Sequence, residues 1–144
     1  MVGICQQGLF SVAGKDYMRR VKVVNITYGV RDFVWVDFPE NAQKPEFIGI
    51  HPAVVISIKN NNRIPYLVLP ATSKAQDTTD PYVWKLIKRL RVDMVDTWVI
   101  CSHIYAVAHT RIQKRASPLK VDQHDFDQIG QRCCIRLPFE YSEK

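Results

Sequence analysis

Three polar sites interrupt the apolar segments of this sequence, and each carries side chains suited to acid–base or phosphate chemistry. The first is His51, which comes directly before Pro52 at the start of an apolar run. The second is Thr72–Ser73–Lys74, which ends another apolar run. The third is the pair Ser102–His103, inside the apolar segment 98–107.

His51 has two interpretations. A residue before proline is held in an extended conformation, so its side chain projects in a fixed direction. An imidazole fixed in this way can act as an acid or a base near neutral pH. Alternatively, His51 caps the strand by bonding a nearby carbonyl group. The sequence leaves both open.

The other two sites also have both a functional and a purely structural interpretation. Two hydroxyls and a cation at Thr72, Ser73 and Lys74 suit a phosphate group, but such residues also form ordinary turns in which a hydroxyl bonds the backbone. A polar pair inside a buried strand must find hydrogen-bond partners. His103 is therefore either a satisfied core histidine or a second acid or base.

Metal and nucleotide motifs are missing from the sequence. The four histidines and four cysteines show no spacing typical of a metal site. Cys133 and Cys134 are adjacent, and no CxxC pair occurs. We expect no metal and no cofactor, and we expect the thiols to act as small apolar side chains in a reducing cytosol.

Apolar runs predict several strands and one helix. The nearly continuous β-branched run 52–58 predicts a central strand that is buried on both faces. The stretch 82–96 fits either a helical face or an alternating strand. Further strands are expected at 33–38, 64–72 and 97–112.

The C-terminal part predicts a helix over 122–137. Asp122 is a suitable N-cap, and Phe126, Ile129, Cys133 and Leu137 fall on one face. Several buried strands with one closing helix indicate a mainly β fold, a compact antiparallel sheet or a small barrel.

Composition limits the class of protein. The chain has 144 residues, 47% of them hydrophobic, which suits one globular domain and excludes a wholly disordered chain. The longest apolar run, 47–58, is far below the ~18 residues of a membrane span, and no signal peptide is expected. The net charge of +6 favours phosphates or acidic surfaces, so nucleic acid is a candidate partner.

Four segments carry a resemblance to a known family. They are RDFVWVDF (31–38), KPEFIGIHPAVVIS (44–57), LVLPATS (67–73) and DTWVICSHIYAVAHTRI (96–112). In this order and spacing they resemble the MazF/PemK toxins of type II toxin–antitoxin systems. The resemblance covers about residues 30–137, whereas residues 1–28 have no clear counterpart. We therefore expect an N-terminal extension (1–28) and a toxin domain (29–144).

The resemblance implies an SH3-like small β-barrel with a C-terminal helix, and it favours a strand around 82–87. It also implies a cytoplasmic homodimer, an antitoxin protein as partner and single-stranded RNA as substrate. The family cuts RNA without a metal: the ribose 2′-hydroxyl attacks the adjacent phosphorus and leaves a 2′,3′-cyclic phosphate. That reaction needs a proton acceptor, a proton donor and stabilisation of the phosphorane.

Catalytic roles in the family fall on an Arg before proline and on a Thr at a strand end. These are the positions of His51 and Thr72, and His103 is a further acid or base if its ring faces the same cleft. The RNA-binding residues expected from the resemblance are Glu46, Gly49, Ser73, Lys74 and Ser102.

The sequence departs from the family pattern at the Arg position, which holds His51. It also departs where the family has an acidic residue and Gln, which are Ser102 and His103, and where it has Gly, which is Arg31. Arginine is always charged and binds phosphate bidentately, whereas histidine can exchange a proton. The chain is therefore either a ribonuclease with histidine-based chemistry or a binding module without catalysis.

A gyrase-targeting protein of the CcdB type, which shares the fold, is a further alternative. The Trp-Gly-Ile end of such proteins is absent, since this chain ends in EYSEK.

Overall fold

The regular structure of the described chain consists mainly of short antiparallel strands. The computed structural model describes residues 26–91, 94–114 and 118–137. Nearly all of the expected extension (1–28) lies outside these residues. The elements are β1 (Asp32–Phe38), β2 (Gly49–Val55), β3 (Tyr66–Thr72), β4 (Val83–Lys85), β5 (Trp98–Ile100), β6 (Tyr105–Val107), the 3-10 helix η1 (His109–Arg111), β7 (Leu119–Lys120) and α3 (Gln123–Cys134).

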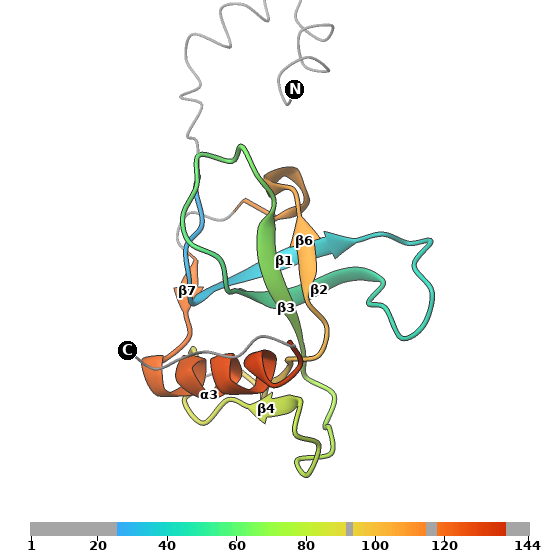
Figure 1. The fold of residues 1–144 in the computed structure, drawn as a ribbon, viewed down its shortest axis with the longest axis vertical. Coiled ribbons are helices and arrows are strands. Elements are labelled where there is room, and N and C mark those ends of the chain that lie inside the picture. Colours follow the sequence, from blue (N-terminus) through green and yellow to red (C-terminus); the bar gives the residue numbers. More distant parts are fainter. Residues whose placement is uncertain (1–25, 92–93, 115–117, 138–144) are drawn as a thin grey trace, which may run out of the picture.

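The strands form one curved sheet in the order β4-β5-β3-β2-β1-β7, and β6 pairs with the first half of β3 (Figure 1). The sheet curves into a half-barrel, and α3 lies beside β4 at the lower end of the view. This confirms the predicted mainly β fold with a C-terminal helix. None of the helices in the described segments is long and apolar enough to cross a membrane.

Alternation along the strands gives the sheet two apolar faces. One, here called the helix face, packs Phe33, Val54 and Leu69 with Ile129 and Cys133 of α3. The other, here called the loop face, carries a second buried cluster that includes Val36, Phe38, Val55, Tyr66 and Val68. The central strands are thus buried on both sides, as the near-continuous apolar run predicted.

Two prolines interrupt the hydrogen-bond ladders in the middle of the sheet. The Leu67 carbonyl accepts from the Ile56 amide. The backbone N–H and C=O groups of odd-numbered residues in β3 therefore point toward β2, and those of even-numbered residues point toward β5 and β6. Pro70 therefore has no N–H to donate toward β5. Its neighbour there, when the register is continued by one residue, is Ile100. The Ile100 carbonyl accepts instead from the His103 amide (3.3 Å), within the turn that separates β5 from β6.

Pro52 has the corresponding effect between β2 and β3. Even-numbered residues of β2 direct their backbone groups toward β3, so the N–H that Pro52 lacks would have faced β3. The pairing of β2 with β3 ends at Ala53 and Pro70. The pairing of β2 with β1 continues to Gly49, opposite Phe38. The first residues of β2 are consequently held by β1 alone.

The structure corrects two sequence predictions and decides a third that the sequence left open. The strand expected at 52–58 runs from Gly49 to Val55, so His51 lies inside it rather than before it. The strand expected at 97–112 is two short strands and a 3-10 helix, so Ser102–His103 lies in a turn and not in a buried strand. The stretch 82–96 contains the short strand β4, as the family resemblance favoured.

The helix begins as predicted and ends early. The Asp122 carboxylate accepts from the His124 amide (3.2 Å) as N-cap, but α3 ends at Cys134, so Leu137 lies beyond it. Asp125 is buried and accepts from Trp84 Nε1 (2.9 Å) and from the Ile87 and Lys88 amides, which fixes α3 to the β4 segment.

Candidate active site

His51 is half-buried on the loop face of β2. Its Nε2 donates to the Ile48 carbonyl at 2.9 Å, and its ring packs edge-on against Phe47 with the centroids 5.0 Å apart. A carbonyl only accepts, so Nε2 carries the proton in the neutral ring. This leaves Nδ1 as the nitrogen that can take up a proton. The predicted carbonyl bond and a basic nitrogen thus occur in the same side chain.

His103 reaches the same aromatic ring from the turn after β5. Its Nε2 donates to the Pro45 carbonyl (3.0 Å), and its Nδ1 lies 2.9 Å from the Ser102 hydroxyl. Its ring packs edge-on against Phe47 with centroids 5.7 Å apart. Phe47 therefore contacts both imidazoles, although they are 52 positions apart in sequence.

Thr72 ends β3 on the loop face. The β2–β3 register, continued two residues past Ala53 and Pro70, puts Thr72 opposite His51. Its hydroxyl accepts from the Lys74 amide (3.1 Å), which is the predicted hydroxyl–backbone turn. Ser73 and Lys74 are exposed in the turn that follows.

His51 and Thr72 belong to a row of side chains that lie opposite one another on neighbouring strands, and this row continues beyond Thr72. Thr72 pairs with Trp98, and Trp98 pairs with Lys85 on β4. The Lys85 ammonium lies 5.3 Å from the centre of the Trp98 ring and 3.3 Å from Asp96. Hydrogen bonds donated by Lys85 and Arg89, together with the positive charge of Lys85, lower the pKa of the Asp96 carboxyl. A basic nitrogen, a hydroxyl, an aromatic ring and a cation thus occupy one row.

Two hydrogen bonds hold the loop 39–48, here called the site loop, next to this row. The Phe47 amide donates to the Tyr105 hydroxyl (2.8 Å), and the Pro45 carbonyl accepts from His103. Within the loop, the exposed Glu46 carboxylate accepts from the Gln43 amide (2.7 Å). The loop enters β2 through Gly49, whose φ of +76° favours glycine.

The structure thus gathers His51 and His103 around Phe47 and sets Thr72 in the same row. Ser102 positions His103, and Glu46 lies in the site loop. Sequence reasoning missed Phe47 and Tyr105, which connect the predicted residues. The signal was an aromatic residue in an otherwise polar loop, followed by Gly and a strand.

A hollow of about 350 Å³ opens beside the site loop, here called the loop-face hollow. Phe38, Phe47 and Tyr105 line its aromatic side, and Asn41, Glu46 and Arg111 contribute polar groups. Phe38 and Phe47 also contact the His51 ring, so the hollow adjoins the candidate site.

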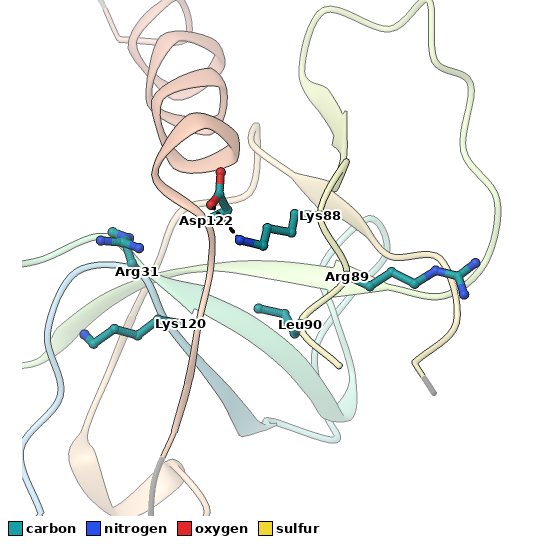
Figure 2. Close-up of a pocket in the computed structure, with 6 residues that line it drawn as sticks. All are labelled: Arg31, Lys88, Arg89, Leu90, Lys120 and Asp122. Atoms are coloured by element: carbon teal, nitrogen blue, oxygen red, sulfur yellow. Dashed lines mark ion pairs between the residues drawn. The ribbon is translucent and has the colours of Figure 1, made fainter. Parts of the chain in front are cut away.

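A second hollow of about 170 Å³ lies on the helix side, where the chain enters α3 (Figure 2). It is lined by Arg31, Lys88, Arg89, Leu90, Lys120 and Asp122. Figure 2 shows Lys88 pointing toward Asp122 (3.5 Å), whereas Arg89 extends away from the other side chains.

The cations of this second hollow already have partners. The Lys120 ammonium pairs with the buried Asp32 (2.8 Å), and Arg89 pairs with Asp96 (3.2 Å). The Arg31 guanidinium donates through Nε to the Val121 carbonyl at 2.8 Å. These contacts tie the strand ends and α3 together, so the basic lining has a structural use.

Within the described ranges, no three His, Cys, Asp or Glu residues are grouped to hold a metal ion. The described cysteines are free, and burial raises the pKa of the Cys101 thiol to about 12. Such a thiol is not a nucleophile near neutral pH.

In a comparison with protein families, residues 30–136 match the PemK-like, MazF-like toxins of type II toxin–antitoxin systems. The chain belongs to this family. The match begins just before β1 and ends just after α3, so it includes every described element. This confirms the resemblance carried by the four sequence segments. No curated protein sequence matches the chain.

Solved structures share the fold at low sequence identity. MazF from Deinococcus radiodurans (Form-I) is 19% identical with a TM-score of 0.61, and the match covers 75% of this chain and 94% of that one. An endoribonuclease in complex with its cognate antitoxin, from a mycobacterial species, is 12% identical with a TM-score of 0.59, covering 80% and 99%. MazF in the Deinococcus radiodurans MazE–MazF complex (Form-III) is 18% identical with a TM-score of 0.53, covering 75% and 94%.

Proposed function

We propose that this PemK/MazF-like toxin is a metal-independent endoribonuclease that cleaves single-stranded RNA, such as mRNA, in the cytoplasm. The ribose 2′-oxygen attacks the adjacent phosphorus, and the bond from phosphorus to the 5′-oxygen breaks. The products are a 2′,3′-cyclic phosphate and a 5′-hydroxyl end. The observation that carries the proposal is that His51 and His103 both contact Phe47, while Thr72 lies opposite His51 in the continued strand register.

His51 is the proposed general base. Its Nε2 is committed to the Ile48 carbonyl, so Nδ1 takes the proton from the 2′-hydroxyl. His103 is the proposed acid: in its protonated form it gives the proton on Nδ1, the nitrogen beside the Ser102 hydroxyl, to the departing 5′-oxygen, while Nε2 stays bonded to the Pro45 carbonyl. The Thr72 hydroxyl donates to a non-bridging oxygen of the phosphorane, because its bond to Lys74 uses only an acceptor lone pair.

Five further residues are proposed to bind the RNA around the scissile phosphate. Lys74 and Ser73 supply a cation and a hydroxyl in the exposed turn after β3, where a backbone phosphate can approach. Ser102 orients His103, and Gly49 lets the site loop approach the substrate closely. Glu46 contacts the substrate from the site loop.

The protein is proposed to work as a homodimer that an antitoxin protein neutralises. Ile48 and Ile50 at the start of β2 are 41% and 53% exposed, and Leu67 on β3 is 40% exposed. Exposed apolar side chains near a candidate site are typical of protein interfaces. A protein with the same fold, the mycobacterial endoribonuclease, has a solved structure in complex with its cognate antitoxin. A monomeric mass by light scattering at micromolar concentration would argue against the dimer.

The deciding experiment is incubation of the protein with a long single-stranded RNA in EDTA, followed by chemical mapping of the new ends. Cyclic phosphates and 5′-hydroxyls at discrete positions would support the proposal. Cleavage that appears only with added divalent metal would overturn the mechanism. No cleavage of any RNA, together with inhibition of DNA gyrase, would favour the binding module instead.

A further inference from the structure

The loop-face hollow has the size and lining of a site for one nucleobase. Its volume of about 350 Å³ lies at the lower end of the range for small-molecule pockets. Phe38 forms a buried floor, and Phe47 and Tyr105 are half-buried beside it. Proteins that bind single-stranded RNA stack splayed bases on aromatic side chains in this way.

Polar groups at the rim of the hollow have hydrogen-bonding capacity to spare. Glu46 uses one carboxylate oxygen for the Gln43 amide, and the described contacts leave the other oxygen available. The Tyr105 hydroxyl accepts from Phe47 and can still donate its own proton. One guanidinium nitrogen of Arg111 donates to the Asp37 carbonyl (3.2 Å), and the other N–H groups of the guanidinium remain as further donors.

A carboxylate that only accepts discriminates between bases. Adenine, cytosine and guanine carry an amino group on the Watson–Crick edge, whereas uracil has a single N3–H donor there between two carbonyl oxygens. A carboxylate that accepts from this N3–H is brought close to both carbonyl oxygens, so uracil is bound less favourably than a base with an amino group. Donors on Tyr105 and Arg111 meet the ring nitrogens or carbonyls of the same edge.

We propose that the loop-face hollow binds one base of the RNA next to the scissile phosphate and selects an amino-bearing base against uracil through Glu46. This inference rests on the proposed function and adds a specificity determinant to it. The hollow reaches the cleavage site through Phe47, which lines the hollow and contacts both imidazoles.

The first test measures binding without cleavage. NMR titration of the full chain with the four 5′-mononucleotides should give weaker binding for UMP than for AMP, CMP or GMP, by about fivefold or more. Glu46→Gln keeps an oxygen for the Gln43 amide but adds a donor, so it should reduce this difference to less than about twofold. Glu40→Gln, an exposed site-loop change outside the hollow, is the matched control and should behave as the parent.

The second test uses cleavage of a randomised RNA pool. The parent should disfavour uracil at one position beside the cut, and Glu46→Gln should relax that position alone by about fivefold or more. Equal binding of all four nucleotides by the parent would overturn the proposal, as would an unchanged preference in Glu46→Gln.

The two proposals can fail separately. Glu46-dependent nucleotide selection in a protein that cuts no RNA would sustain the base site and reject the ribonuclease. RNA cleavage whose base preference does not depend on Glu46 would support the ribonuclease and reject the base site. If Glu46→Gln weakens only the binding of the antitoxin, the hollow is a protein-binding site and the base site is rejected.

Discussion

The two hollows of this molecule differ in how their polar groups are used. In the helix-side hollow of Figure 2, Lys88, Lys120 and Arg89 each pair with a carboxylate. In the loop-face hollow, Glu46 and Tyr105 each make a single bond to the backbone, and aromatic rings form the wall. The more basic hollow therefore stabilises the fold, while the less basic one has groups available for a ligand.

This difference shows why a net charge of +6 does not locate a nucleic-acid site. Cations that are bonded to carboxylates within the protein must lose those contacts before they can bind phosphate. Half-buried aromatic rings with unused donors and acceptors beside them carry no such cost. The predictions below test this comparison from the largest expected effect to the smallest.

Changing His51 should have the largest effect, because it removes the proposed base on the loop face. His51→Ala should lower RNA cleavage by about 10²-fold or more, the usual loss for a general acid or base. The measurement is the single-turnover cleavage rate in EDTA, with circular dichroism to verify folding. His51→Arg restores the family residue, so it should bind RNA at least as tightly as the parent.

The pH profile separates the two roles of that position. Histidine changes charge near neutral pH whereas arginine does not. Any cleavage by His51→Arg should therefore depend less on pH than cleavage by the parent. A parent rate unchanged in His51→Ala would leave His51 as a residue that only bonds the Ile48 carbonyl.

Asp125 should have the largest effect on stability, on the helix side. Asp125→Ala leaves the Trp84 indole and two backbone amides without their acceptor, which should cost at least about 2 kcal/mol of unfolding free energy. Urea unfolding measures this loss. Asp127→Ala, on the exposed side of α3, is the control and should change stability by less than about 0.5 kcal/mol.

Arg31 tests whether the helix-side hollow carries strain. Its φ of +74° lies in the left-handed region, where the family has glycine. Arg31→Gly and Arg31→Ala both lose the bond to Val121, but only glycine relieves the backbone. Arg31→Gly should therefore be more stable than Arg31→Ala by about 1 kcal/mol in urea unfolding. Equal stabilities would mean that the backbone at this position is unstrained.

Two charge deletions give the smallest expected effects and the most direct comparison. Lys88→Ala removes a largely exposed ion pair with Asp122 and should change RNA affinity by less than about twofold. Arg111→Ala removes the same charge from the loop-face hollow and should weaken affinity by about fivefold or more. Filter binding at fixed salt measures both. A larger loss in Lys88→Ala would assign RNA binding to the helix side.

Much of the fold could be predicted because its signals are local. β-branched runs marked β2 and β3 as buried strands, and the spacing of Phe126, Ile129 and Cys133 marked α3 together with its cap at Asp122. The strand limits were less predictable. Where β2 stops pairing with β3 and where β5 ends depend on which neighbouring strands the missing donors of Pro52 and Pro70 face, and that is a property of sheet register.

For the site, the sequence by itself determined the residue types and their order, from His51 through Thr72 to His103. Only the tertiary structure decided that the two imidazoles share the Phe47 ring and that the loop-face hollow lies beside them. The physical reason is range: a periodic pattern reports contacts within one element, whereas the bonds from His103 to Pro45 and from Tyr105 to Phe47 join residues 58 positions apart. Such contacts form only after the sheet has brought the site loop and the turn after β5 together.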